Sequence, residues 1–436
     1  MKVSIQAGKS VSPLGAKVLA AAVFTAGFFW AGQAWAADVV ITSEQQSADL
    51  VPLGFLDIPC LNGDPAQLPY RPGAVLHDDL SFSGRFRLTK AARFDSSSKT
   101  LFVQDGALAY LQGNYTLVGG QFTLDCEVLD IDTQEPIIRK KYSGSQSGLR
   151  DAVHQFADEM VWQLFGERGI ARTKLTIVSK HSGNKEIVVM DYDGFGTQAL
   201  TRNKSINLTP IFLGGKDKVI FTSYLKGTPN FYLADVTSAK ITPYFSTGFM
   251  CSAPGYNKMD KEVVYAASKD GNSEIYRRPA DATGKATRLT FNGGIDTSPS
   301  WSPNGYEIVF MSDRSGKPML YVMDRDGANV RRITYDGDYY GSPTWSPKGD
   351  RIACSSLDEG NNFSIWTLSP DGKDARKLTS GGGSNESPTW SPDGRHIAFM
   401  STRTGSPEIW VMRADGTNPR RLSFTGGNSM PSWSDF

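Results

Sequence analysis

The sequence predicts a small α+β domain followed by an all-β, six-bladed β-propeller that is closed by the C-terminal strand. Three observations support this fold class. A Trp-Ser-Pro motif recurs in the second half of the chain, a proline two residues before it recurs every 43 to 45 residues, and the first and last repeats are incomplete in complementary ways. Repeats of about 40–45 residues with four short strands each are typical of propeller blades.

The repeated motif begins at Trp301, Trp345 and Trp390, and a fourth copy at Trp433 reads Trp-Ser-Asp. The prolines that define the period are Pro210, Pro254, Pro299, Pro343, Pro388 and Pro431. In the two earliest copies another aromatic residue takes the place of the tryptophan. We expect the tryptophans to pack between neighbouring blades, because they stand at one repeated position. Six prolines at this period predict six blades.

The last full repeat shows how each blade is built. Its strands, lettered A to D, are expected at residues 387–391, 397–400, 408–412 and 420–423. Pro392-Asp393-Gly394 forms the first turn, where proline presets φ and glycine accepts a positive φ. Strand B recurs at residues 177–179, 219–223, 263–268, 308–312 and 352–356.

The two ends of the repeat region complement each other. Residues 174–201 supply strands B, C and D without a strand A, whereas residues 430–436 supply a strand A and nothing after it. Pairing the two completes a blade, closes the ring and removes the open sheet edges. We therefore expect the propeller to span residues 172–436.

Residues 1–36 have the pattern of a cleaved signal peptide. A basic start precedes an uncharged apolar run at residues 18–31, and Ala34-Trp35-Ala36 then places small residues before a cleavage site between Ala36 and Ala37. The alternative is an uncleaved anchor, but the run has 14 residues and a membrane helix needs about 20. The sequence predicts a mature protein outside the cytoplasm, with no transmembrane segment.

The charge balance argues against a nucleic-acid or membrane-surface partner. Lys and Arg number 46 and Asp and Glu 45, which gives a net charge of +1. Such a chain supplies no broad electrostatic field for a polyanion. Partners are therefore expected to be recognised by shape and local contacts.

The sequence contains no pattern that predicts catalysis. Propellers of this repeat type also precede the catalytic domain of serine peptidases, but a Gly-x-Ser-x-Gly nucleophile motif is absent. The four histidines, His77, His154, His181 and His396, have no metal-ligand spacing. His154, on a predicted helix, is expected to be a packed or surface residue. We expect no catalytic residue, metal or cofactor.

The four cysteines leave the disulfide state open. Cys60 and Cys126 stand before the repeats, and an oxidising compartment permits a bond between them. Buried thiols are the alternative. Cys251 and Cys354 lie in repeats that are not adjacent, so a bond between them is not expected.

Residues 37–171 lack the repeat and are expected to form an α/β domain. Apolar residues at helical spacing predict a helix at residues 148–166, which Gly166 can end. A second helix is expected at residues 74–82. Strands are expected at residues 108–112, 122–130 and 137–142.

Three segments of this domain carry a family resemblance. They are Asp79-Leu80-Ser81-Phe82-Ser83-Gly84-Arg85-Phe86, His154 with Ala157-Asp158-Glu159, and Gly166-Glu167-Arg168-Gly169 with Arg172-Thr173. Together with the order of signal peptide, α/β domain and six blades, they resemble the TolB family of the Tol-Pal envelope system over nearly the whole chain. The second and third repeats depart from the family pattern, with Gly214-Gly215-Lys216 and Asn257-Lys258-Met259 in place of Trp-Ser-Pro-x-Gly.

The resemblance implies a non-enzymatic, monomeric periplasmic adaptor that supports outer-membrane integrity and envelope constriction in cell division. It implies that the propeller face binds the peptidoglycan-associated lipoprotein Pal. It also implies that the segment 37–50 binds the C-terminal domain of TolA. The TolA-binding residues so implied are Asp38, Val39, Val40, Ile41 and Thr42.

The loops that enter strand A are expected to crowd around the channel mouth and to form the Pal-binding face. The candidates on these loops are Phe249, Met250, Asp296, Thr297, Tyr339, Asn385, Glu386 and Asn428. Met250 and Thr297 also align with family positions linked to Pal binding, and exposed Phe, Met and Tyr suit a protein interface. Ordinary loop variation, a channel that binds a glycan or small ligand, and a peptidase-type propeller without its catalytic domain remain as alternatives.

Overall fold

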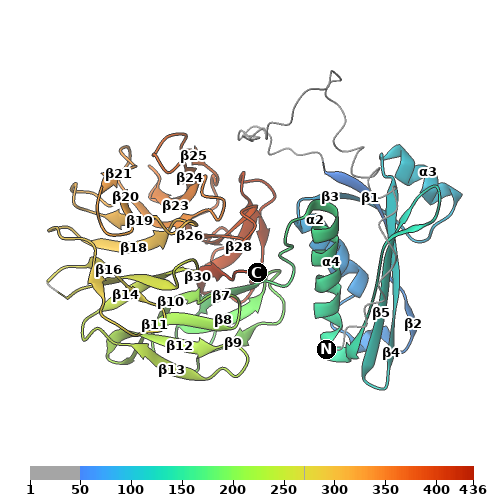
Figure 1. The fold of residues 1–436 in the computed structure, drawn as a ribbon, viewed down its shortest axis with the longest axis horizontal. Helices are drawn as coiled ribbons and strands as arrows, with labels where there is room; N and C mark the ends of the chain where they lie inside the picture. Colours follow the sequence, from blue (N-terminus) through green and yellow to red (C-terminus); the bar gives the residue numbers. More distant parts are fainter. Residues whose placement is uncertain (1–49, 270) are drawn as a thin grey trace, which may run out of the picture. The chain divides into compact units, whose positions relative to one another are not determined.

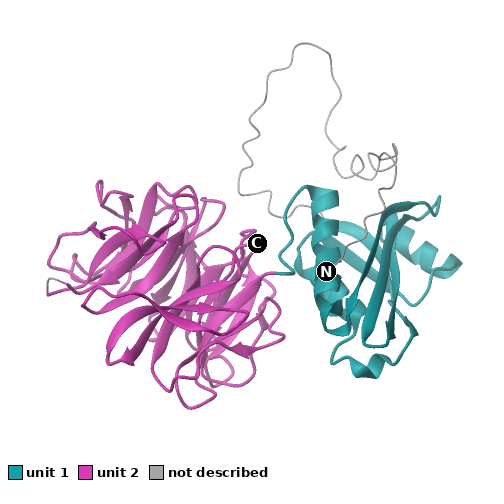
Figure 2. Ribbon diagram, turned by 60° about the horizontal axis from the view of Figure 1, so that its bottom comes forward, with its two compact units in different colours: residues 1–172 teal, residues 173–436 magenta. Residues whose placement is uncertain are grey.

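The computed structural model describes residues 50–269 and 271–436. The chain forms two compact units, Met1–Arg172 and Thr173–Phe436 (Figure 2). The predicted signal peptide and the predicted TolA-binding residues from Asp38 to Thr42 lie outside the described residues and stay predictions. Within the described ranges, no helix combines the length and the apolar character needed to cross a membrane.

The first unit consists of a six-stranded sheet and helices (Figure 1). Its strands are β1 (Val51–Leu56), β2 (Cys60–Asn62), β3 (Phe86–Ala91), β4 (Ala109–Val118), β5 (Gln121–Asp130) and β6 (Pro136–Ser145). Its helices are α2 (Pro72–Phe82), α3 (Ser96–Gln104) and α4 (Leu149–Phe165), with short 3-10 turns at Pro65–Gln67 and Gln146–Gly148. Strand β1 runs parallel to its neighbours β3 and β4, while β4, β5 and β6 are antiparallel.

The two predicted helices of this unit are confirmed. Helix α4 buries Leu149, Phe156 and Met160, and it ends at Gly166, whose φ of 69° is the left-handed conformation that glycine favours. Helix α2 starts two residues before the predicted position, because Pro72 occupies its first turn.

The prediction missed β1, β2, β3 and α3. Strand β1 contains proline and glycine, which weaken a strand pattern. Its Gly54 is required by packing, since a Cβ atom there would lie 2.5 Å from Cδ2 of Phe102. Helix α3 is rich in serine, a weak helix former, and is held by a capping box in which Asp95 accepts bonds from Ser97 and Ser98.

The second unit is a propeller of six four-stranded sheets, as predicted. Blade 1 contains β30 (Asn428–Trp433), β7 (Lys174–Ser179), β8 (Glu186–Asp191) and β9 (Gln198–Ala199); blade 2 contains β10 (Asn207–Phe212), β11 (Lys218–Lys226), β12 (Thr228–Asp235) and β13 (Ile241–Phe245). Blade 3 contains β14 (Cys251–Asn257), β15 (Glu262–Ala267), β16 (Glu274–Pro279) and β17 (Thr287–Arg288).

The remaining three blades repeat this order. Blade 4 contains β18 (Asp296–Trp301), β19 (Glu307–Ser312), β20 (Met319–Asp324) and β21 (Arg331–Arg332). Blade 5 contains β22 (Tyr340–Trp345), β23 (Ile352–Leu357), β24 (Phe363–Leu368) and β25 (Arg376–Lys377). Blade 6 contains β26 (Asn385–Trp390), β27 (His396–Ser401), β28 (Glu408–Arg413) and β29 (Arg420–Arg421).

The predicted closure is confirmed. Strand β30 pairs antiparallel with β7, so that Asn428 faces Ser179 and Trp433 faces Leu175. The first sheet thus joins the two ends of the propeller. Strand D is shorter than predicted in blade 6, with two residues in place of four.

Each strand A contains a β-bulge at the residue before its repeated proline. The register shifts there in all six blades. The bulged residues have a left-handed backbone and are Thr209, Ala253, Ser298, Ser342, Ser387 and Met430. Because a proline has no N–H to donate, it is tolerated in a strand at such a bulge. The repeated proline therefore marks a bend in each inner strand.

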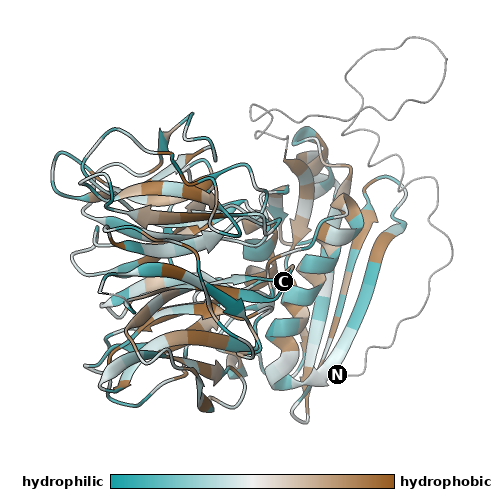
Figure 3. Ribbon diagram, turned by 60° about the vertical axis from the view of Figure 1, so that its left-hand side comes forward, coloured by the Kyte–Doolittle hydropathy of each residue, from teal (hydrophilic) through white to brown (hydrophobic). Residues whose placement is uncertain are grey.

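The repeated tryptophans pack between blades, as predicted. Each of the four is 7% exposed. The indole N–H of Trp390 donates to the carbonyl of Thr344 in blade 5 at 3.2 Å, and the backbone N–H of Trp345 donates to the Ser300 hydroxyl of blade 4 at 3.2 Å. Figure 3 shows the apolar segments along the strands of the blades, with mainly polar turns.

We expect removal of residues 429–436 to unfold the propeller, because the deletion takes away strand A of blade 1 and Trp433 together. Trp433→Ala removes a buried aromatic side chain and should lower the free energy of unfolding by about 3–5 kcal/mol. The propeller should stay folded after this change. Trp433→Phe, which keeps an aromatic ring, should cost less. Thermal melts of the three variants test this, and a truncated protein that melts within a few degrees of the parent would show that closure is not required.

We expect the propeller to lose stability as the pH drops below about 6.5, which is the usual pKa of a histidine in an unfolded chain. Burial, opposed by Asp393 and assisted by Arg420, lowers the pKa of His396 to about 4. The unfolded chain then binds a proton that the folded chain does not. The loss should approach roughly 3 kcal/mol as the pH falls to about 4. Urea denaturation across this range should show a smaller slope for His396→Gln, while exposed His181→Gln serves as the control. Equal slopes for parent and His396→Gln would contradict this assignment.

Candidate interaction site

The connections from strand D of one blade to strand A of the next lie beside the B–C turns. Lys180 donates its backbone N–H to the carbonyl of Gly427 at 3.1 Å, and Thr402 donates to Ser384 at 2.9 Å. These segments form one face of the propeller, called the D–A face from here on. On the opposite face the A–B and C–D turns meet, as Arg325 N–H donates to the carbonyl of Tyr306 at 2.9 Å.

Five of the eight predicted face residues have side chains that reach solvent on the D–A face. Phe249 and Met250 are exposed, and Thr297, Tyr339 and Glu386 are half-buried. Burial raises the pKa of the Glu386 carboxyl. It also raises the pKa of Tyr339, with a further contribution from the Glu386 carboxylate.

The other three predicted face residues are buried and bonded within the propeller, and their contact with a partner stays a prediction. Asp296 accepts bonds from Arg314 at 2.8 Å and from Asn292 at 2.7 Å. The Asn385 side chain accepts from Arg403 at 2.8 Å. Asn428 belongs to a buried network described next. The three side chains fix the D–A connections from inside.

Buried glutamates at the start of strand C hold these connections in three blades; we call them carboxylate corners. They are Glu186, Glu274 and Glu408, and each accepts a bond from a Thr or Ser just after strand D. Burial would raise the pKa of Glu408, but bonds from Ser423, Asn428, Gly426 and Arg421 outweigh it and lower the pKa. A charged carboxylate with this many donors is stable inside a protein.

Sequence reasoning missed the carboxylate corners, although a signal was present. In the three blades a glutamate is followed 15 or 16 residues later by a Thr or Ser. The same corner also fixes an arginine in two blades. Arg288 contacts Glu274 at 2.8 Å and Arg421 contacts Glu408 at 2.6 Å. Each corner therefore ties strand C to the following connection, and the D–A face is rigid at these points.

The six A strands enclose a channel with a cavity of about 500 Å³. Hydroxyl side chains form much of its wall: Thr209, Ser298, Ser300, Ser342, Thr344, Ser387, Thr389 and Ser432. Some of these groups already bond between blades, as Ser300 does with Trp345. At the wall, Lys258 and Asp435 form an ion pair at 2.9 Å. In the ranges that the structure describes, no three His, Cys, Asp or Glu residues gather as a metal site would require.

The family-like residues of the first unit form structural contacts. Nδ1 of His154 on α4 lies 2.7 Å from Oδ2 of Asp79 on α2, and both side chains are buried. His154 is therefore packed, one of the two positions expected. Asp158 accepts from the N–H of Ala171 at 2.8 Å, and a Cβ at Gly169 would lie 2.2 Å from its Oδ1. These residues order the end of the unit.

The cysteines are free thiols in this structure. Cys126 is buried, and its burial raises the pKa of the thiol. Cys60 is half-buried. Cys60 and Cys126 are therefore separate thiols in the structure, not a disulfide.

The fold defines a two-domain propeller protein, with an α+β unit followed by six closed blades. The TolB beta propeller domain matches residues 161–435. Since this is more than half of the 436 residues, the chain belongs to the TolB family of the Tol-Pal system.

Relatives agree with this assignment. A Protein TolB homolog of Chlorobium luteolum is 39% identical over 330 residues, which are 76% of this chain and 75% of the relative. The Tol-Pal system protein TolB of Desulfosudis oleivorans is 35% identical over 50% of this chain and 52% of its own. The crystal structure of TolB from Acinetobacter baumannii aligns with a TM-score of 0.74 and 22% identity, over 89% of this chain and 98% of that one, and shows the same fold.

We expect Glu408→Ala to destabilise the propeller by at least about 2 kcal/mol, because the Ser423 and Asn428 donors lose their buried acceptor. Urea denaturation measures the change. Glu359→Ala, in an exposed turn of blade 5, is the matched control and should leave stability within about 0.5 kcal/mol of the parent. If both variants were equally stable, the corner would not hold the connection.

Proposed function

We propose that this chain is a periplasmic, non-enzymatic adaptor of the Tol-Pal system. It binds Pal through the D–A face and the C-terminal domain of TolA through the segment 37–50. In this role it supports outer-membrane integrity and envelope constriction during cell division. Membership of the TolB family and the similarity to the Tol-Pal system protein TolB of Desulfosudis oleivorans support the assignment.

The observation that carries the Pal proposal is the exposure of Phe249 and Met250 on a face with fixed connections. Phe249 is 39% and Met250 54% exposed, and the carbonyl of Met250 accepts the N–H of Ser268 at 2.9 Å. Aromatic and methionine side chains are enriched at protein interfaces. Thr297, Tyr339 and Glu386 complete the proposed contact set, whereas Asp296, Asn385 and Asn428 act from beneath it.

Export by the signal peptide 1–36 accounts for the proposed location. Cleavage after Ala36 would release a monomer that begins at Ala37. The basic start and the short apolar run support this step. The net charge of +1 is consistent with protein partners rather than nucleic acid.

The two partner sites are proposed to be linked through the segment 37–50. This segment leads directly into β1, the strand between β3 and β4. Terminal segments are commonly marginal in stability unless they are tied down. Pal binding favours a docked segment that TolA cannot reach, and linkage then requires TolA to weaken Pal binding by the same factor.

We expect saturating TolA domain to weaken Pal binding by about 5–150-fold. Calorimetric titration of Pal, with and without the TolA domain, measures this factor. Deletion of residues 37–48 should abolish TolA binding, keep the Pal affinity and remove the effect of TolA on Pal. Equal Pal affinities in the two parent titrations would show that the sites are independent.

A further inference from the structure

Three D–A connections carry an exposed aromatic residue three positions after an arginine. The aromatic residues are Phe291, Tyr335 and Phe424, with exposed fractions of 74%, 68% and 72%. They follow strand D of blades 3, 4 and 6. Side chains this exposed do not pack in the propeller core, and exposed apolar residues that lie close together mark interaction sites.

Each of these rings is held by its arginine. The guanidinium carbon of Arg288 lies 4.6 Å from the ring centre of Phe291, and that of Arg421 lies 4.7 Å from Phe424. Arg288 in turn bonds the buried Glu274 at 2.8 Å and the carbonyl of Thr290 at 2.8 Å. The carboxylate corner thus fixes the arginine and the arginine orders the ring. A ring that is ordered before binding loses less entropy when a partner covers it.

The third ring is held in a similar way. The guanidinium carbon of Arg332 lies 5.0 Å from the ring centre of Tyr335. Nη2 of Arg332 donates to the carbonyl of Tyr335 at 3.3 Å, and the Tyr335 hydroxyl donates to the carbonyl of Arg332 at 2.9 Å. Tyr335 is therefore fixed by local bonds rather than by a carboxylate corner.

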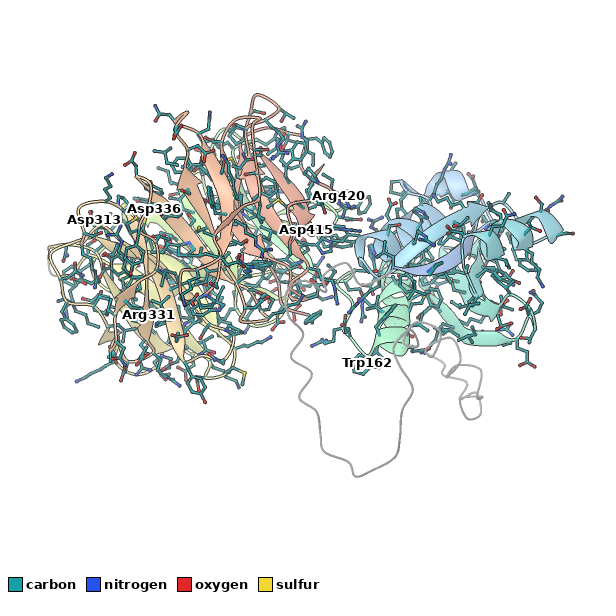
Figure 4. All side chains as sticks on the ribbon, turned by 90° about the horizontal axis from the view of Figure 1, so that it is seen from above. Trp162, Asp313, Arg331, Asp336, Asp415 and Arg420 are labelled. Atoms are coloured by element: carbon teal, nitrogen blue, oxygen red, sulfur yellow. The ribbon has the colours of Figure 1, made fainter. Side chains whose placement is uncertain are left out.

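Exposed apolar side chains are most numerous on three consecutive D–A connections, which we call the aromatic arc. Its members are Phe249 and Met250 before blade 3, Phe291 and Ile295 before blade 4, and Tyr335 before blade 5. The next connection has Ser380-Gly381-Gly382-Gly383 at the corresponding place. Phe424, before blade 1, is separated from Tyr335 by this glycine-rich connection and from Phe249 by the connection before blade 2, where Ile206 is 48% exposed. In Figure 4, Asp336, which follows Tyr335, and Arg420 of blade 6 are labelled at separate places on the propeller.

A shallow hollow, widely open to solvent, lies beside Phe291. Its lining residues are Gly271, Asn272, Arg288, Phe291, Asn292 and Gly293. The amide of Asn272 donates to the carbonyls of Asn292 at 2.8 Å and Gly294 at 2.7 Å, which fixes the B–C turn on the D–A connection. One wall of the hollow is therefore an aromatic ring on a fixed frame.

We propose that the aromatic arc anchors Pal, with Phe291 and Tyr335 as specificity-determining residues. This inference rests on the proposed function. It extends the contact set outward from Phe249 and Met250 and makes it asymmetric around the ring. Phe424 has the same exposure and the same arginine stacking but lies off the arc, so it takes little part.

The test is calorimetric titration of the soluble domain of Pal against the full mature chain and four variants. Phe291→Ala and Tyr335→Ala should each weaken binding by about tenfold or more. Phe424→Ala is the matched control with the same motif, and it should change affinity by less than about twofold. Tyr306→Ala, a 66% exposed aromatic residue on the opposite face, is the second control. Thermal melts show whether each variant folds. If Phe291→Ala fails to fold, Ile295→Ser tests the same connection in its place.

The outcomes separate this inference from the function on which it rests. If the parent chain fails to bind Pal, both the proposed function and the inference about the aromatic arc are wrong. If the parent binds and Phe291→Ala and Tyr335→Ala bind equally well, the arc alone is wrong. If Phe424→Ala loses as much affinity as Phe291→Ala, the contact is symmetric around the ring and the asymmetric arc is overturned.

Discussion

The pairing of β30 with β7 is the interaction on which the rest of the propeller depends. These strands come from opposite ends of the repeat region, yet they lie side by side in one sheet. Without this pairing, blade 1 would lack its inner strand and the ring would have two open edges. Every A strand contacts the A strands of both neighbouring blades. The indole N–H of Trp433 also donates to the hydroxyl of Thr173, the residue before β7, at 2.9 Å. Closure therefore sets the geometry of the channel and of both faces.

The closed ring positions the D–A connections, and the carboxylate corners make three of them rigid. Glu274 and Glu408 have no exposed side-chain surface, so their charge must be satisfied by local donors. The donors come from strand D and from the connection that follows it. A buried charge thus converts a surface connection, which would ordinarily be mobile, into a fixed part of the frame. The buried polar residues therefore determine which side chains of the D–A connections are exposed to solvent.

The order of the blades could be predicted from the sequence because proline and tryptophan mark one position in each repeat. The same signals could not show which residues of the D–A connections face outward. Asn428 stands at the start of a strand and looks like a rim residue, but Glu408, 20 positions earlier, draws its amide inward at 2.8 Å. Contacts of this kind depend on how strands C and A come together in space. In the first unit, likewise, Pro52 and Gly54 obscured the strand pattern of β1, and the fit of Gly54 depends on Phe102, which is remote in the sequence.

The position of β30 also decides when the propeller can form. Residues 174–191 provide two strands of blade 1, but they must wait for residues 428–433 before their sheet has an inner strand. During synthesis, every other blade can assemble its four strands in order while the first stays incomplete. Blade 1 is thus the first blade to be started and the last to be completed. Until then, β7 has an unpaired edge on which a chaperone or a second chain can add a strand.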